Sequence, residues 1–193
     1  TIDFLEVYGY DKNYDFSKLE NPKLDSLVED IAKKKKSWNE IEIDKKEKKI
    51  KLAEGQRIDL GGIGKGYAID LAFNHLKNVC PNFLINAGGD IRSSGKNLEN
   101  KYWLTELKTP DGSAGQIELE NMSLSSSGSW ARKVKQFHHL IDPRLGKPVE
   151  KNYSTVFVLG DTSIKTDTWA TALFILGQET AESKADGVSA IFL

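Results

Sequence analysis

Residues 57–70, "RIDLGGIGKGYAID", place four glycines and one lysine between a predicted strand and a predicted helix. Glycine permits positive φ and lets backbone N–H groups approach a ligand without an intervening Cβ. A helix N-terminus attracts anions through its unpaired N–H groups, and Lys65 adds a positive charge beside them. The stretch therefore predicts either a phosphate-binding loop or a tight strand-to-helix turn.

The glycine spacing matches neither of the two standard nucleotide-binding motifs. A P-loop needs Ser or Thr directly after its Gly-Lys pair, whereas here Gly66 follows Lys65. The spacing of Gly62, Gly64 and Gly66 also differs from that of the dinucleotide-binding fingerprint. The loop alone therefore does not identify a ligand.

Composition is that of an ordinary globular protein. The 193 residues are 39% hydrophobic, enough for one well-packed domain or two small lobes. With 27 basic and 28 acidic residues the formal charge is −1, so no net field favours nucleic acid or an anionic membrane. The single cysteine, Cys80, excludes an internal disulfide, and we expect it to be a small half-buried side chain.

Hydropathy predicts no membrane span, because no segment approaches the roughly 20 consecutive apolar residues that a membrane helix needs. The chain begins with Thr1, as expected of a processed or trimmed chain whose targeting segment was removed. The compartment stays open: cytoplasmic, or extracytoplasmic with the targeting segment absent.

The first third of the chain predicts a helix and a hairpin. Within residues 20–37, Asn21 is a good N-cap and Pro22 fits the first turn of a helix. Residues 41–52 alternate apolar and polar side chains around a charged turn, which is typical of a hairpin. Four apolar side chains are expected on its inner face: Ile41, Ile43, Ile50 and Leu52.

The remaining two thirds predict one long helix followed mostly by strands. The helix runs from Gly64 to about Asn78, with Ile69, Ala72, Phe73 and Leu76 at helical spacing. A strand over 82–91 contains the glycine turn at Gly88 and Gly89. Further strands are expected in 103–120, 154–160 and 187–193, the last two flanking a helix near 166–177. Residues 122–133 are expected to form another strand that ends in a serine-rich loop. This order favours an α+β fold with mixed or antiparallel sheets and packed helices.

One polar cluster, in "QFHHLIDPRLGKP" (136–148), is suited to acid–base chemistry. His139 precedes Asp142 by three residues, and this spacing would allow the imidazole to be held for proton transfer. The alternative is an ordinary core or surface histidine.

A second polar cluster, in "TDTWATALFIL" (166–176), is suited to a cation. Asp167 and Thr171 are four residues apart on one helical face. A carboxylate and a hydroxyl suit Mg²⁺, which completes its coordination with phosphate oxygens and water. The alternative is a helix cap formed by Thr166 or Asp167.

Four motifs in fixed order resemble the ApbE-like flavin transferases, which are FAD:protein FMN transferases. They are "DLGGIGKGYAID" (59–70), "INAGGDI" (85–91), "LSSSGSWARK" with "HLIDPRLGKPV" (124–133 and 139–149), and "TDTWATALFILG" (166–177). The likeness runs from about Asp59 to the C-terminus and extends more faintly over the first helix and hairpin. It implies an ApbE-like (T-fold-like) architecture and a single domain over 1–193 that lacks the family's usual N-terminal segment.

The resemblance implies Mg²⁺-dependent transfer of FMN from FAD to a Thr or Ser hydroxyl of an acceptor protein, with release of AMP. The acceptor would be a subunit of a redox complex. Two alternatives are an FAD pyrophosphatase that forms FMN and AMP, and a non-catalytic FAD-binding protein. Retention of His139, Asp167 and Thr171 argues against the last, because binding alone does not need a base beside a metal.

The resemblance also assigns roles residue by residue. Asp167, Thr171 and the backbone carbonyl of Gly64 would bind the metal. His139 would be the base for the acceptor hydroxyl. Asp167 would be the second catalytic residue. The residues expected to contact FAD are Asp59, Gly61, Gly62, Lys65, Asn86, Gly88, Gly89, Asp90, Ser126 and His139. Asp90 replaces the family's Glu, and Ser126 replaces its Thr.

Overall fold

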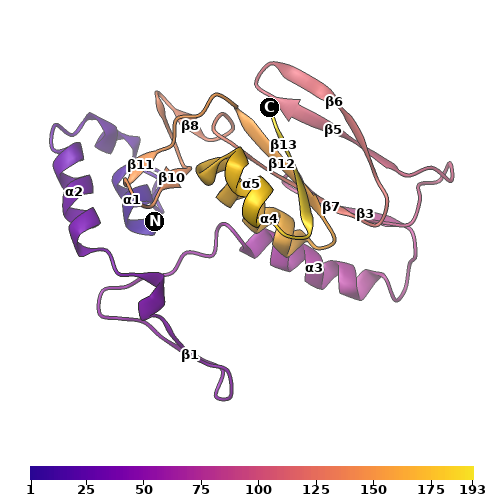
Figure 1. The fold of residues 1–193 in the computed structure, drawn as a ribbon, viewed down its shortest axis with the longest axis horizontal. Helices are drawn as coiled ribbons and strands as arrows, with labels where there is room; N and C mark the ends of the chain where they lie inside the picture. The colour runs from indigo at the N-terminus through magenta and orange to yellow at the C-terminus, as the bar shows by residue number, and fades with distance from the viewer. The chain divides into compact units, whose positions relative to one another are not determined.

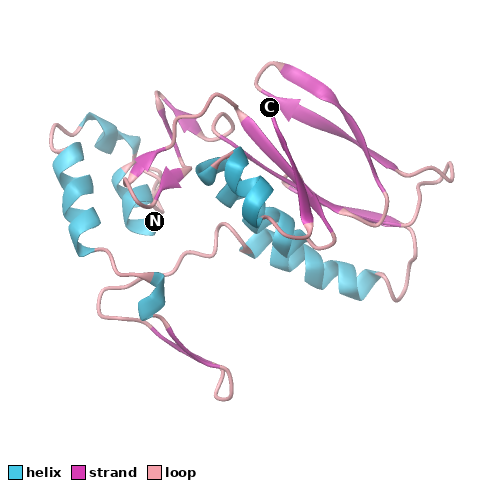
Figure 2. Ribbon diagram, in the orientation of Figure 1, coloured by secondary structure: helices cyan, strands magenta, loops and turns pink.

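The computed structural model describes residues 1–193, which form two compact units (Figures 1 and 2). The first unit comprises residues 1–59 and 134–149, and the second unit comprises residues 60–133 and 150–193. The helix and strand content confirms the predicted α+β class. The single domain over 1–193 stays a prediction.

The second unit is built on a five-stranded sheet in the order β13-β12-β7-β4-β3, with all neighbouring strands antiparallel. The strands are β3 (Phe83–Ala87), β4 (Asp90–Ser94), β7 (Ser123–Gly128), β12 (Thr155–Gly160) and β13 (Val188–Phe192). The unit also contains α3 (Gly64–Leu76), α4 (Ser163–Leu176), α5 (Gln178–Lys184) and the hairpin of β5 (Trp103–Thr109) and β6 (Gly112–Leu119).

Side-chain alternation gives the two faces of this sheet different partners. Leu124 and Phe157 point to the face covered by the β5–β6 hairpin, where they pack with Leu107 and Leu119 in an apolar core. The other face lies against α3 and α4, as Figure 1 shows. On β7 that face carries serines, so the sheet meets α4 through small polar side chains.

The first unit has shorter elements around a smaller core. They are α1 (Ile2–Val7), α2 (Leu24–Lys34), the 3-10 turns η1 (Phe16–Glu20) and η2 (Trp38–Glu40), and the hairpin of β1 (Glu42–Asp44) and β2 (Lys49–Lys51). β8 (Lys133–Val134) lies where the chain enters this unit, followed by β9 (Phe137–His138), β10 (Ile141–Asp142) and β11 (Lys147–Pro148). The buried core consists of Phe4, Tyr8, Val28 and Ile141.

Three details of the first unit differ from the sequence predictions. The predicted helix is present, but it begins at Leu24, and Asn21 closes a turn by accepting a hydrogen bond from the Lys23 N–H instead of serving as the N-cap. The predicted hairpin is also present. Its paired Ile43 and Ile50 are exposed rather than inward-facing, because this two-stranded ribbon has no covering layer.

In the second unit, the helix predicted from Gly64 is α3, which ends at Leu76. Ile69 is buried on it, whereas Ala72 and Leu76 are exposed. Cys80 is exposed rather than half-buried, and its thiol donates to the Asn82 carbonyl oxygen. Across the whole fold, no helix is both long enough and apolar enough to cross a membrane.

Candidate functional site

Helices α3 and α4 are in close contact where Gly66 meets Ser163. A Cβ on Gly66 would lie 2.3 Å from the Ser163 carbonyl oxygen and 2.7 Å from its carbonyl carbon. Both are backbone atoms, which cannot move aside as a flexible side chain would. Glycine at position 66 is therefore a requirement of the helix contact.

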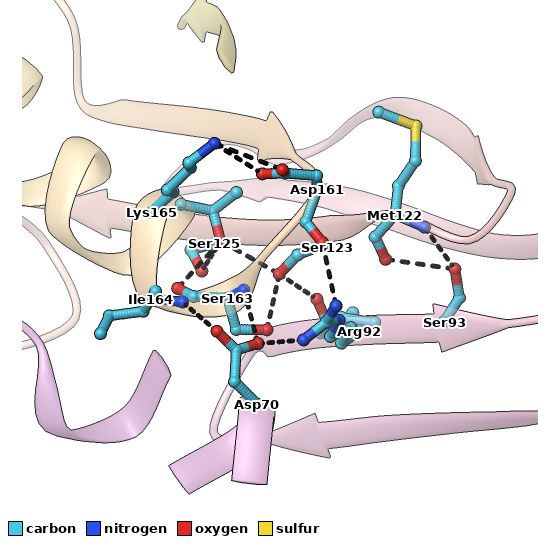
Figure 3. A network of polar contacts seen from close by, with 12 residues as sticks. Asp70, Arg92, Ser93, Met122, Ser123, Ser125, Asp161, Ser163, Ile164 and Lys165 are labelled. Carbon is cyan, nitrogen blue, oxygen red and sulfur yellow. Dashed lines mark hydrogen bonds and ion pairs between the residues drawn. The ribbon is translucent and has the colours of Figure 1, made fainter. Parts of the chain in front are cut away.

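At this crossing each helix supplies a carboxylate to the N-terminus of the other. The Gly66 N–H in the first turn of α3 donates to the Asp167 carboxylate at 2.9 Å. The Ser163 and Ile164 N–H groups at the start of α4 donate to the Asp70 carboxylate at 2.8 and 3.0 Å (Figure 3). First-turn N–H groups lack partners within their own helix and favour negative charge, so both contacts are stabilising.

Asp167 therefore does not cap its own helix. Helix α4 begins four residues earlier, at Ser163, so Asp167 and Thr166 lie in its second turn and the predicted cap is wrong. The Thr166 hydroxyl is buried between the Ser123 and Ser125 hydroxyls, at 3.0 and 2.8 Å. Because the Gly66 N–H donates to the Asp167 carboxylate, this N–H is not available to a phosphate.

A lysine bridges two buried carboxylates at this place. Lys65 Nζ lies 3.6 Å from an Asp167 oxygen and also forms an ion pair with Asp90. Burial raises the pKa of Asp90, an effect that the Lys65 ammonium opposes and the Asp167 carboxylate reinforces. With both carboxylates ionised, one ammonium leaves a net negative charge that a cation would balance.

Thr171 lies one helical turn beyond Asp167, and its hydroxyl is 3.1 Å from the Ser127 hydroxyl on β7. Serines 123, 125 and 127 alternate along β7, so all three point toward α4. Thr171 is half-buried, and this polar interface holds its hydroxyl beside the sheet.

These oxygens fit Mg²⁺ better than a softer metal. No group of three or more His, Cys, Asp or Glu side chains is placed to hold an ion. Mg²⁺ typically takes one or two carboxylates and completes its shell with phosphate oxygens and water. The Asp167 carboxylate, the Thr171 hydroxyl and the backbone carbonyl of Gly64, two residues before Gly66, are oxygen donors of this kind.

The predicted glycine turn joins β3 to β4, directly before Asp90. Gly88 and Gly89 have φ of +64° and +98°, a region where other residues are strained, and the Gly89 N–H donates to the Asn86 side-chain oxygen at 3.0 Å. Asn86 thus fixes the turn. Ser126 is exposed on β7, and its backbone N–H reaches the Asp90 carboxylate.

The loop before α3 is exposed. Gly61 and Gly62 have exposed backbones, and a Cβ added to Gly62 or Gly64 would meet no atom within 4 Å. No neighbouring atom therefore crowds Gly62 or Gly64, and phosphate binding by this loop stays a prediction. Asp59, also exposed, belongs to the first unit.

His139 also lies in the first unit, half-buried, with its ring centroid 6.1 Å from that of Tyr10. Its neighbour His138 is buried, with Nδ1 accepting from the Leu140 N–H and Nε2 2.9 Å from the Val149 carbonyl oxygen. His138 is therefore a satisfied core histidine. Asp142 pairs with Arg144, which lowers the pKa of that carboxyl.

The structure therefore gathers Lys65, Asp90, Asp167 and Thr171 in the second unit, and Gly64 directly precedes Lys65 in the chain. The sequence analysis missed Asp70, Arg92 and Ser163, which hold α3 against α4. A signal was present: Asp70 follows Gly66 by four residues, just as Asp167 follows Ser163. The spacing becomes informative only once the two helices are known to cross.

Comparison with known proteins gives consistent matches. A family model described as the ApbE family matches residues 6–192. The FAD:protein FMN transferase of Haemophilus influenzae is 29% identical over 187 residues, which cover 89% of this chain and 54% of the relative. That of Buchnera aphidicola is 34% identical over 140 residues, covering 68% of this chain and 41% of the relative.

Solved structures share the fold. The crystal structure of the ApbE protein from Thermotoga maritima is 25% identical and superimposes with a TM-score of 0.83, covering 98% of this chain and 64% of that one. The chain spans about half the length of the curated relatives it matches. Because the family model covers residues 6–192, the chain belongs to the ApbE family.

Proposed function

We propose that this chain transfers FMN from FAD to a Thr or Ser hydroxyl of an acceptor protein through a phosphoester bond, with release of AMP. The observation that carries the proposal is the placement of Asp167, which contacts both the Gly66 N–H and Lys65, with Thr171 one turn away. Family membership supports the same activity, because the curated relatives are named FAD:protein FMN transferase.

Within this proposal, Asp167, Thr171 and the Gly64 carbonyl hold Mg²⁺. The ion would neutralise charge on the pyrophosphate and stabilise the AMP leaving group. Lys65 contributes a positive charge for phosphate oxygens once it exchanges its carboxylate partners for the ligand. The exposed loop at Gly61 and Gly62 and the turn formed by Asn86, Gly88 and Gly89 would line the nucleotide, together with Asp59, Asp90 and Ser126.

The transfer itself needs positioning and charge neutralisation more than covalent help. The acceptor hydroxyl oxygen forms a bond to the phosphorus of the FMN half, and the bond from that phosphorus to the AMP oxygen breaks. The hydroxyl proton passes to His139, acting as general base. AMP leaves with the electrons of the broken bond. The acceptor would be a subunit of a redox complex.

The test is to incubate the chain with FAD, Mg²⁺ and an acceptor domain, and to weigh the acceptor by intact-mass spectrometry. We expect a mass gain of one FMN phosphoester, and none for an acceptor whose target Thr is replaced by Val. Asp167→Asn should lower the rate at least about a hundredfold, because the site loses the charge that holds the cation.

The matched control is Asp161→Asn. Asp161 is an exposed aspartate two residues before α4, paired with Lys165 at 3.1 Å, and its replacement should leave the rate unchanged. Full activity of Asp167→Asn at physiological Mg²⁺ would contradict the metal assignment. Free FMN and AMP without labelled acceptor would identify a pyrophosphatase instead.

A further inference from the structure

The reciprocal carboxylates of α3 and α4 have different surroundings. Asp167 faces Lys65 and the candidate metal site, whereas Asp70 faces Arg92 on β4. Both members of the Asp70–Arg92 pair are largely buried, with side chains 15% and 11% exposed. The Asp70 carboxylate thus contacts Arg92 on one side and the N-terminus of α4 on the other.

Arg92 connects three elements at this point. One of its terminal nitrogens pairs with Asp70, and the other donates to the Asp161 carbonyl oxygen at 3.0 Å (Figure 3). The guanidinium carbon lies 3.7 Å from the centre of the Phe73 ring. Asp70 and Phe73 belong to α3, and Asp161 leads into α4. Arg92 therefore fixes the Asp70 carboxylate at the place where α4 begins.

The position of Asp167 follows from where α4 begins. Asp70 holds the N–H groups of Ser163 and Ile164, and Asp167 lies one turn after Ser163 on the same rigid helix. The buried Thr166 hydroxyl secures α4 to the sheet, whereas the Asp70 contacts secure it to α3, where Gly66 and Lys65 lie. A shift of α4 along α3 would carry Asp167 and Thr171 away from that helix together.

We propose that Asp70, held by Arg92, is a positioning residue that sets α4 so that Asp167 and Thr171 face the metal. This inference rests on the proposed function. Outer partners that orient metal ligands typically change metal affinity about 10- to 100-fold when they are removed.

The test measures binding of Mn²⁺, as a probe for Mg²⁺, to the full chain by electron paramagnetic resonance, with no turnover required. Asp70→Asn keeps the side-chain shape but loses the charge and one acceptor oxygen. We expect its Mn²⁺ dissociation constant to rise about 10- to 100-fold. FAD affinity measured in EDTA should stay near the wild-type value, because it reports the rest of the site.

Two further variants separate positioning from charge and from folding. Arg92→Lys keeps both charges but cannot bridge Asp70 and the Asp161 carbonyl, so we expect weakened Mn²⁺ binding here also. Asp161→Asn removes an exposed carboxylate near the same helix N-terminus and keeps the carbonyl that Arg92 uses, so it should bind like wild type. If Asp70→Asn does not fold, Arg92→Lys decides the question.

Wild-type Mn²⁺ affinity in both Asp70→Asn and Arg92→Lys would overturn the positioning role while leaving the proposed function intact. An equal loss of Mn²⁺ and FAD affinity would also overturn it, because that result indicates general loosening. A wild-type chain that binds no Mn²⁺ would overturn the metal site itself, and this inference with it.

Discussion

The two units of the molecule keep their shape by different means. In the second unit, five strands and two long helices enclose fully buried side chains such as Val156, Val158, Leu173 and Phe174, together with a buried polar network. In the first unit, short helices and strands of two or three residues surround a core cluster of four buried side chains, and exposed ion pairs link distant segments. Exposed ion pairs contribute about 0 to 1 kcal/mol each.

This difference separates the candidate site residues into two groups. Asp167, Thr171 and Asp90 lie on the well-packed elements of the second unit, where small displacements are costly. His139 follows directly after the two-residue strand β9. We infer that the proposed metal ligands Asp167 and Thr171 are held rigidly, whereas the proposed base is carried by a part of the chain that opens more readily.

The strongest test of this contrast is Phe4→Ala. Phe4 is 2% exposed in the small core of the first unit, and truncating a buried Phe typically costs about 3 to 5 kcal/mol. Hydrogen exchange should accelerate in residues 1–59 and 134–149 while β7 and β12 stay protected. Equal acceleration in β7 and β12 would show that the two units unfold together, and the contrast would be lost.

A smaller effect is expected at the contact between α3 and α4 in the second unit. Gly66→Ala places a Cβ against the Ser163 backbone and should lower the free energy of unfolding by about 1 to 3 kcal/mol. Gly64→Ala, two residues away in open space, should leave stability unchanged or raise it by up to about 1 kcal/mol. Urea unfolding followed by circular dichroism distinguishes the two, and similar values for both variants would contradict the close helix contact.

The smallest effect concerns an exposed charge in the first unit. Arg144 lowers the pKa of Asp142, so this carboxylate stabilises the fold above the ordinary Asp pKa of about 4, and the contribution is lost as pH falls through the lowered value. Arg144→Gln should therefore move acid unfolding to higher pH. Arg144 is 67% exposed and solvent screens its charge, so the loss of stability at neutral pH should be smaller than that of Gly66→Ala.

Acid titration by circular dichroism measures this shift, and Lys165→Gln is a control because Lys165 lowers the pKa of the exposed Asp161 in the second unit. An unchanged acid midpoint for Arg144→Gln would show that the backbone N–H groups alone hold Asp142.

Local patterns predicted most elements of the second unit. The glycine turn at Gly88 and Gly89 and the helix beginning at Gly64 are set by backbone requirements that neighbouring residues reveal. Periodicity could not show that Ile43 and Ile50 lack a covering layer, because an alternating pattern does not specify what packs against it. In the same way, Asn21 was predicted to cap the helix, but its side chain accepts a hydrogen bond from the Lys23 N–H in the turn that precedes the helix.

Part of the candidate site was also predictable from the sequence. The Asp167 and Thr171 pair follows from helical spacing, and Lys65 follows from its place in the glycine loop. The resemblance supplied Gly64 as their proposed partner. Asp70 and Arg92 were not predicted, because their importance arises from contacts between segments more than twenty residues apart in the chain. Such contacts depend on the crossing of α3 and α4, which no local pattern encodes.

The exposed β1–β2 hairpin also offers a practical use. A two-stranded ribbon contributes little to stability on its own, and its turn contains Lys48 at a φ of +53°. Loop tips of this kind tolerate insertions. A fluorophore or short peptide tag placed between Asp44 and Lys49 would report on partner binding without altering any residue assigned to the candidate site.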